Sequence, residues 1–132
     1  MAGMRRPSFI SAMMLLLLAS SACNSATEPR TIDVEDVVFT ARKPTLEIRN
    51  NTDKPIFYFV VGRNASAYTD WYPCVDETEC PTIPPKGTLV KTYQELGIQQ
   101  TEVEALVWWW HAVTVDGQRK PEFIHQGLIK IR

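Results

Sequence analysis

Three cysteines are the residues with the most definite chemistry in this chain of 132 residues. Cys74 and Cys80 lie close together, whereas Cys23 lies near the beginning of the sequence. A zinc site needs a tetrahedral set of closely spaced cysteine or histidine ligands, and the only histidines, His111 and His125, are far apart in sequence. We therefore predict no metal and no cofactor, and a disulfide between Cys74 and Cys80 is the competing interpretation of the close pair. The odd number of cysteines leaves Cys23 to be explained.

The residues before Cys23 have the composition of an export signal. Two arginines supply a positive charge, residues 9–18 are mostly apolar, and residues 20–22 have the small side chains that a signal peptidase requires. The apolar run is too short to cross a membrane, since a transmembrane helix needs about 20 apolar residues. We therefore predict a cleaved signal peptide over residues 1–22.

Ser21, Ala22 and Cys23 resemble the end of the lipobox of a bacterial lipoprotein precursor, although Ser20 stands where that family commonly has Leu. In this family the cysteine thiol receives a diacylglyceryl group, and cleavage leaves the acylated cysteine as the first residue. The resemblance implies that Cys23 carries lipid, palmitate among its acyl chains. Ordinary signal-peptidase cleavage, which would leave a soluble secreted or periplasmic protein, is the alternative.

Lipid on Cys23 implies attachment to a membrane, because several acyl chains hold a protein where one chain binds only marginally. An Asn after the cysteine is typical of outer-membrane sorting, so Asn24 implies that membrane, on its periplasmic or surface side. Residues 23–31 are then expected to be a polar tether and residues 32–132 a single domain. The other two cysteines would remain as a pair in an oxidising compartment, where disulfides persist.

The charge balance argues against one class of partner. The 14 Lys and Arg include Arg5 and Arg6 of the signal, which leaves 12 against 15 Asp and Glu and a net charge of −3 for the mature part. Nucleic-acid binding needs clustered Lys and Arg, and the sequence has no basic run. We expect a monomer that does not bind nucleic acid.

The hydropathy pattern of the mature part is that of strands. Residues 45–50 alternate apolar and charged side chains, and residues 56–61 form a β-branched and aromatic run that is apolar on both faces. With a turn at 51–55, these two segments suggest a hairpin. Further strands are predicted over residues 36–41, 88–93 (a candidate edge strand), 103–115 and 123–131, with a turn at 116–121.

Helical signal is limited to two short segments, residues 65–70 and 93–97, and neither could cover a sheet. Short strands without a helix layer must bury their apolar faces against another sheet. We therefore predict an all-β fold, a single small antiparallel β-sandwich. The strand order resembles immunoglobulin-like or fibronectin-like domains of bacterial surface proteins, although Cys74 and Cys80 lack the long spacing of the immunoglobulin disulfide.

Aromatic residues form the candidate binding surface. Successive strand side chains point to opposite faces, so Trp108 and Trp110 should share one face and Trp109 the other. The loop that carries Trp71 and Tyr72 is the natural cover for the outer face, which makes packing the simpler interpretation. The functional alternative is an exposed platform of Trp71, Tyr72, Trp108 and Trp110, because Trp and Tyr are enriched at binding hot spots.

No catalytic residues are predicted. A Ser-His-Asp arrangement would need His111 or His125, both in predicted strands, and the mature chain offers only Ser25 and Ser66 as nucleophiles. Neither serine lies in a Gly-x-Ser-x-Gly context. The acidic residues within 76–79 lack the alternating oxygen ligands and the glycine of a calcium loop, which favours a solvated turn. We therefore predict a protein that is not an enzyme.

Two functions from different classes remain. The first is a lipid-anchored interaction or structural module that binds another envelope protein or the cell wall through residues 71–80 and the adjacent strand edge. The second is a carbohydrate- or small-ligand-binding lipoprotein that uses the Trp and Tyr platform. A protease inhibitor that presents the loop from Cys74 to Cys80 is a third, less favoured hypothesis, because a pre-organised loop lowers the cost of binding.

Overall fold

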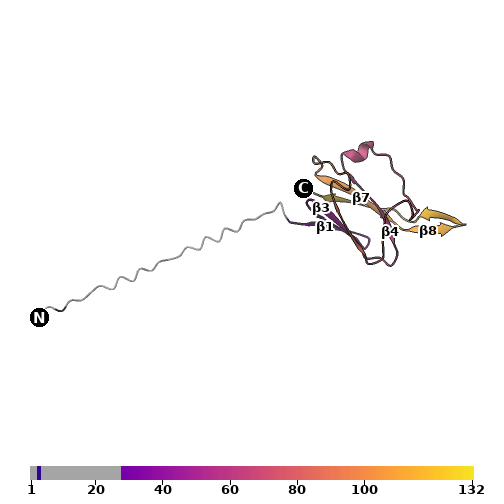
Figure 1. Cartoon of the computed structure of the whole chain (residues 1–132), viewed down its shortest axis with the longest axis horizontal. Helices are drawn as coiled ribbons and strands as arrows, with labels where there is room; N and C mark the ends of the chain where they lie inside the picture. The colour runs from indigo at the N-terminus through magenta and orange to yellow at the C-terminus, as the bar shows by residue number, and fades with distance from the viewer. Residues whose placement is uncertain (1–2, 4–27) are drawn as a thin grey trace.

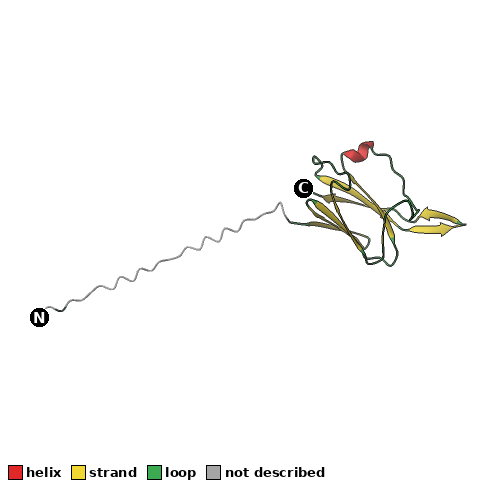
Figure 2. Ribbon diagram, viewed as in Figure 1, coloured by secondary structure: helices red, strands yellow, loops and turns green. Residues whose placement is uncertain are grey.

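The computed structural model describes residue 3 and residues 28–132, so Cys23 and nearly all of the predicted signal peptide lie outside the described residues. The described part is an all-β fold of antiparallel sheets with a single short 3₁₀ helix, η2 (Ala65–Tyr68), which confirms the all-β, antiparallel character of the predicted fold (Figure 2). Within these residues, no helix has the length and apolar character needed to cross a membrane.

The first sheet has four strands in the order β1-β2-β3-β6. Their bounds are β1 (Arg30–Val34), β2 (Val37–Arg42), β3 (Thr45–Asn50) and β6 (Thr88–Thr92). β6 is an edge strand, as its sequence predicts. β1 is additional to the predicted strands, and it begins inside the stretch expected to be tether. It pairs with β2 along its whole length, from Arg30 opposite Ala41 to Val34 opposite Val37.

The second sheet has the order β10-β7-β4-β5, and a separate two-stranded sheet pairs β8 with β9. The bounds are β4 (Ile56–Gly62), β5 (Thr82–Ile83), β7 (Glu104–Trp110), β8 (Ala112–Val115), β9 (Gln118–Pro121) and β10 (His125–Lys130). The two four-stranded sheets share one core, because alternate residues of both are buried in a single cluster. Phe39 and Ile48 enter it from the first sheet, and Val60, Val107 and Ile129 enter it from the second.

The predicted hairpin of residues 45–50 and 56–61 is wrong. Both strands exist, but β3 lies in the first sheet and β4 in the second, so the connection between them crosses from one sheet to the other. The physical reason is the double-sided apolarity of β4. Ile56 is buried in the core and Phe57 is buried on the opposite face, which suits β4 to an inner position between β5 and β7.

The predicted single strand over residues 103–115 is also wrong. It divides at His111, whose Nδ1 lies 3.0 Å from the carbonyl oxygen of Pro55. β7 stays in the second sheet, whereas β8 leaves it and pairs with β9. The β8–β9 turn uses Asp116 and Gly117 at positive φ, of 50° and 77°, the conformation that two-residue hairpin turns favour. Residues 118–121, predicted as turn, are the strand β9.

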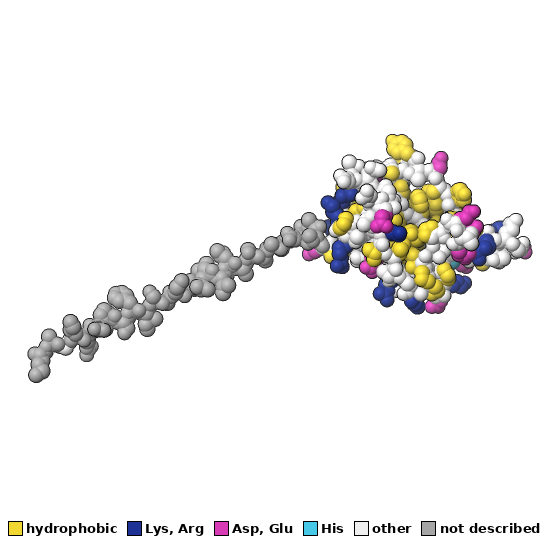
Figure 3. Space-filling view, viewed as in Figure 1, with side chains coloured by type: hydrophobic (Ala, Val, Ile, Leu, Met, Phe, Trp, Pro, Cys, Tyr) yellow, Lys and Arg dark blue, Asp and Glu magenta, His cyan; other side chains and the backbone are white. Residues whose placement is uncertain are grey.

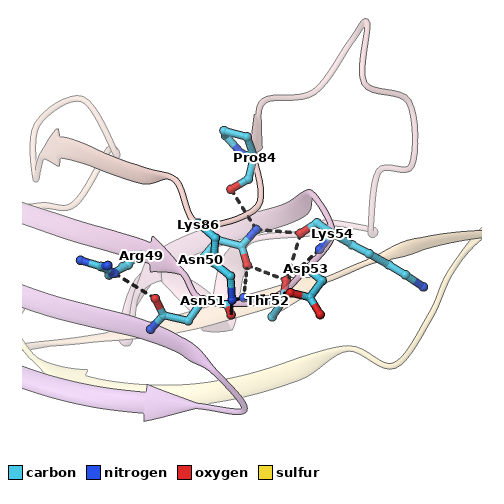
Figure 4. Close-up of polar contacts among 8 residues, drawn as sticks. All are labelled: Arg49, Asn50, Asn51, Thr52, Asp53, Lys54, Pro84 and Lys86. Carbon is cyan, nitrogen blue, oxygen red and sulfur yellow. Dashed lines mark hydrogen bonds and ion pairs between the residues drawn. The ribbon is translucent and has the colours of Figure 1, made fainter.

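A buried asparagine holds the crossing between the sheets (Figure 4). Asn50 is fully buried, and its Nδ2 donates to the carbonyl oxygens of Lys54 (2.8 Å), Ile83 (3.1 Å) and Pro84 (3.1 Å). Its Oδ1 accepts hydrogen bonds from the backbone N–H of Thr52 at 2.9 Å and from the hydroxyl of the same residue at 2.6 Å. One side chain therefore satisfies loop backbone groups that have little access to solvent.

The strands define two ends of the domain. At the first, the entry end, the described chain enters at Arg30, beside the turn at residues 43–44 and the segment 93–103. At the other, the hairpin end, lie the β1–β2 turn, the loop 51–55 and the β8–β9 hairpin. Figure 1 shows the hairpin projecting from the side of the domain away from the start of β1.

Replacing Asn50 with Ala should destabilise the domain by about 2–4 kcal/mol, because the buried side chain's hydrogen bonds to three carbonyl groups and to the two donors of Thr52 are lost. The measurement is urea unfolding followed by circular dichroism. Asn51→Ala is the matched control, since Asn51 bonds only to the exposed Arg49 through its side chain, and it should change stability by less than about 0.5 kcal/mol. Equal losses in the two variants would contradict the role assigned to Asn50.

Candidate functional site

The outer face of the second sheet carries the predicted aromatic residues. The predicted alternation is confirmed: Trp109 belongs to the core, where its Nε1 donates to the carbonyl oxygen of Val34 at 2.7 Å. Trp108 and Trp110 alternate with it in β7 and contact other aromatic rings on the opposite face. Both faces of β7 therefore need a cover.

Trp71 covers the outer face. Its ring stacks on Phe59 with the centroids 4.7 Å apart, and its centroid lies 4.9 Å from that of Trp108 and 5.6 Å from that of Trp110. Trp110 is only 2% exposed, while Trp71 and Trp108 are half-buried. Tyr72 differs from its neighbour because it is 82% exposed. Of the two residues expected to form the cover, only Trp71 does so.

The loop that carries Trp71 is fastened at the hairpin end. Cys74 and Cys80 form the predicted disulfide. The Nε1 of Trp110 donates to the carbonyl oxygen of Cys74 at 2.8 Å, and the Nε of Arg119 donates to that of Val75 at 3.0 Å. Arg119, in β9, also pairs with the carboxylate of Glu77. The disulfide loop is thus joined both to the second sheet and to the β8–β9 hairpin.

The acidic residues of the disulfide loop take part in its own structure. Asp76 Oδ1 accepts from the backbone N–H of Thr78 at 2.9 Å and from its hydroxyl at 2.7 Å. These two bonds, the hydroxyl first, lower the pKa of the Asp76 carboxyl. This geometry fits the predicted turn.

Exposed apolar side chains occur on this braced loop and, separately, on and before the last strand. Tyr72 is exposed on the loop, Leu128 is 42% exposed on β10, and Phe123 and Ile124 are exposed in the segment between β9 and β10. Figure 3 shows hydrophobic side chains gathered on the face that the view presents, interspersed with charged ones. An exposed aromatic side chain on a rigid loop, such as Tyr72, is the kind of residue that is enriched at contact surfaces.

The histidines and the described serine lie apart. Both histidines pack against Trp109 at the hairpin end. The ring of His125 stacks on it with the centroids 4.1 Å apart, and the ring of His111 lies in a T-shaped arrangement with the centroids 5.2 Å apart. Ser66, in η2 near the entry end, donates its hydroxyl to the carbonyl oxygen of Arg63 at 2.6 Å. Ser25 lies outside the described residues. Within the described chain, no group of three or more His, Cys, Asp or Glu side chains is arranged to hold a metal ion.

The tertiary structure adds two site residues that sequence patterns did not indicate. Phe59 was expected only as part of a buried strand, and Arg119 only as part of a turn, yet they hold Trp71 and the disulfide loop respectively. Their partners are distant in sequence, so no local signal identifies them. Comparison of the chain with protein-family models, with curated proteins and with solved structures finds no match.

Replacing Trp71 with Ala should lower the free energy of unfolding by about 2 kcal/mol or more, because it removes the cover from the rings of Phe59, Trp108 and Trp110. Urea unfolding monitored by tryptophan fluorescence and circular dichroism provides the measurement. The adjacent substitution Tyr72→Ala is the control and should cost less than about 0.5 kcal/mol, because its ring is exposed. A destabilisation by Tyr72→Ala as large as that by Trp71→Ala would show that the cover is assigned to the wrong residue.

Proposed function

We propose that this protein is a lipid-anchored, non-catalytic interaction module of a bacterial cell envelope, which binds another envelope protein through its disulfide loop and the adjacent strand edge. One observation carries the proposal. A loop with an exposed Tyr72 is fastened by a disulfide, by Trp110 and by Arg119, and it reaches the end of the domain away from the point where the chain enters. A rigid loop loses little conformational entropy when it binds.

The fold proposed for the module is an immunoglobulin-like β-sandwich. Three features support it: the two four-stranded sheets share one core, the chain crosses between them from β3 to β4 and from β6 to β7, and β10 returns beside β7. These are Greek-key connections of the kind found in such domains. The β8–β9 hairpin would then be an extension of the loop between the last two strands of the sandwich.

The anchor is proposed at Cys23, on the resemblance of Ser21, Ala22 and Cys23 to a lipobox. Seven residues lead from Cys23 to Arg30, the first residue of β1, and a fully extended chain of that length reaches about 25 Å. Lipid on Cys23 would therefore keep the entry end within that distance of the membrane. The outer membrane is the proposed location, and a soluble periplasmic or secreted form is the alternative.

A protein partner is favoured over a glycan by the packing of the aromatic rings. A sugar platform would require tryptophan rings that lie open side by side, but Trp71 packs over Trp108 and Trp110, and Trp110 is buried. The protease-inhibitor alternative is less favoured for a related reason. The carbonyl oxygens of Cys74 and Val75 already accept hydrogen bonds from Trp110 and Arg119, so this part of the loop backbone is not free to pair with an enzyme.

The absence of catalysis is proposed on the separation of the reactive groups. Ser66 lies near the entry end, and its hydroxyl donates to a backbone carbonyl, while both imidazoles pack against Trp109 at the hairpin end. A nucleophile and its base must lie within hydrogen-bond reach of each other. These residues do not form such a pair.

A photocrosslinker tests the proposed contact surface. With p-benzoylphenylalanine in place of Tyr72, illumination of cells should give a discrete crosslinked product with an envelope protein. Tyr68 is the matched control, because it is an equally accessible tyrosine, 91% exposed, in η2 near the entry end. It should give no such product. Crosslinks of equal yield from both positions, or none from position 72, would refute the proposed surface.

Mass spectrometry tests the anchor. The mature wild-type protein should begin at Cys23, carry the mass of its acyl chains and sediment with membranes, whereas Cys23→Ala should do none of these. Recovery of an unacylated mature wild-type protein from the soluble fraction would overturn the lipoprotein proposal and favour simple secretion.

A further inference from the structure

The two ends of the domain differ in charge. Five exposed basic residues lie at the entry end and take part in none of the ion pairs of the described chain: Arg30, Arg42, Lys43, Lys130 and Arg132. At the hairpin end, the exposed side chains outside ion pairs include four acidic residues, Asp33, Glu35, Asp36 and Asp116, and two lysines, Lys54 and Lys120. The protein is net acidic, so this basic surface is a local property of one end.

The acidic side chains of the entry end are mostly occupied. Glu104 pairs with Arg63 at 3.1 Å, and Glu95 pairs with Lys91 at 3.6 Å. Glu102 is buried, and its carboxylate accepts the backbone N–H groups of Asn64 and Ala65, each at 3.0 Å. Glu28, on the segment that precedes β1, and Asp70, which follows η2, are exposed and take part in no ion pair of the described chain. The five basic residues therefore outnumber the unpaired exposed acidic residues of this end.

Two of these basic residues line a hollow at the entry end. The hollow measures about 1010 Å³, and its lining residues include Lys43, Arg132, Gln94, Gln99 and Gln100. The guanidinium of Arg132 lies over the ring of Tyr93, 5.7 Å from its centroid, and its Nε donates to the carbonyl oxygen of Glu102 at 2.6 Å. These contacts orient the guanidinium without neutralising it. Cations and amide donors around one hollow suit a phosphate group.

We propose that the entry end is a membrane-docking surface that binds the headgroups of anionic phospholipids. Charge complementarity supplies the first reason, since Lys and Arg near an anionic bilayer each favour binding. Position supplies the second: the chain enters the domain at this end, and lipid on Cys23 would bring it to within about 25 Å of the bilayer. At physiological salt, charges interact over only about 8 Å, so docking requires direct contact of this end with the headgroups.

The docking surface extends the proposed function. Its contact with a membrane in the cell rests on the proposed lipid anchor at Cys23. The lipid anchor by itself would not fix the orientation of the domain. Contact of the basic end with the bilayer would hold the domain upright, with the acidic hairpin end, the disulfide loop and Tyr72 presented away from the membrane. The acidic side chains of the hairpin end would be repelled by the same surface, which adds to the preference for this orientation.

Vesicle binding without the lipid anchor tests the docking surface separately from the anchor. The chain from residue 24 retains both sheets and every core residue, all of which lie between Val37 and Ile131, and circular dichroism should verify its folding. We expect it to cosediment with vesicles of equal parts phosphatidylglycerol and phosphatidylcholine, but not with phosphatidylcholine alone. Salt at about 0.5 M should abolish binding. Because the chain is net acidic, binding to an anionic vesicle cannot come from its overall charge.

The double variant Arg42→Glu with Lys43→Glu should lower the vesicle partition coefficient at least tenfold. Lys54→Glu with Lys120→Glu makes the same change in charge among exposed residues of the hairpin end and should have less than a twofold effect. Equal losses in the two variants, or no binding of the parent chain to the anionic vesicles, would overturn the docking surface. The anchor proposal would stand or fall separately, on the mass of the Cys23 peptide.

Discussion

The strands β4 and β7 carry large apolar side chains on both faces, so the sheet that they form has to be covered twice. The first sheet covers one face and, with it, encloses the core. An irregular loop covers part of the other face by placing Trp71 on Phe59, Trp108 and Trp110. Much of what distinguishes this domain follows from that second cover, including the disulfide, the Arg119 brace and the exposed Tyr72.

Two adjacent tryptophans join the sheet to its two covers. Trp109 points into the core and donates its indole N–H to Val34 of the first sheet, whereas Trp110 points outward and donates to Cys74 of the loop. A buried indole N–H requires an acceptor, so each ring contributes apolar contact and also positions the backbone that it meets. Near the same end, Asn50 satisfies the carbonyl groups of the crossing segment. The hairpin end is thereby held by specific hydrogen bonds in addition to hydrophobic packing.

The strands themselves could be predicted from the sequence with fair success. The alternation in residues 45–50 and the β-branched run at 56–61 locate β3 and β4, and the alternation of the three tryptophans assigns their faces correctly. The failures concern pairing. A turn-like sequence at 51–55 is compatible with a hairpin or with a crossing between sheets, because both reverse the chain direction. The sequence also did not predict the break at His111, because β-favourable residues continue on both sides of it. The strand ends there because β8 leaves the sheet and pairs with β9.

The sequence by itself determined the strand-rich character of this domain, the alternation of its tryptophans and the pairing of Cys74 with Cys80, because each depends on residue type or on short spacing. The tertiary structure alone decided that Trp71 is a cover and Tyr72 a free surface, that Arg119 holds the disulfide loop, and that unpaired basic side chains gather where the chain enters. Each of these depends on contacts between residues distant in sequence. Such contacts depend on which apolar face of the second sheet is covered by the first sheet and which is covered by the loop. A local sequence pattern does not specify that arrangement.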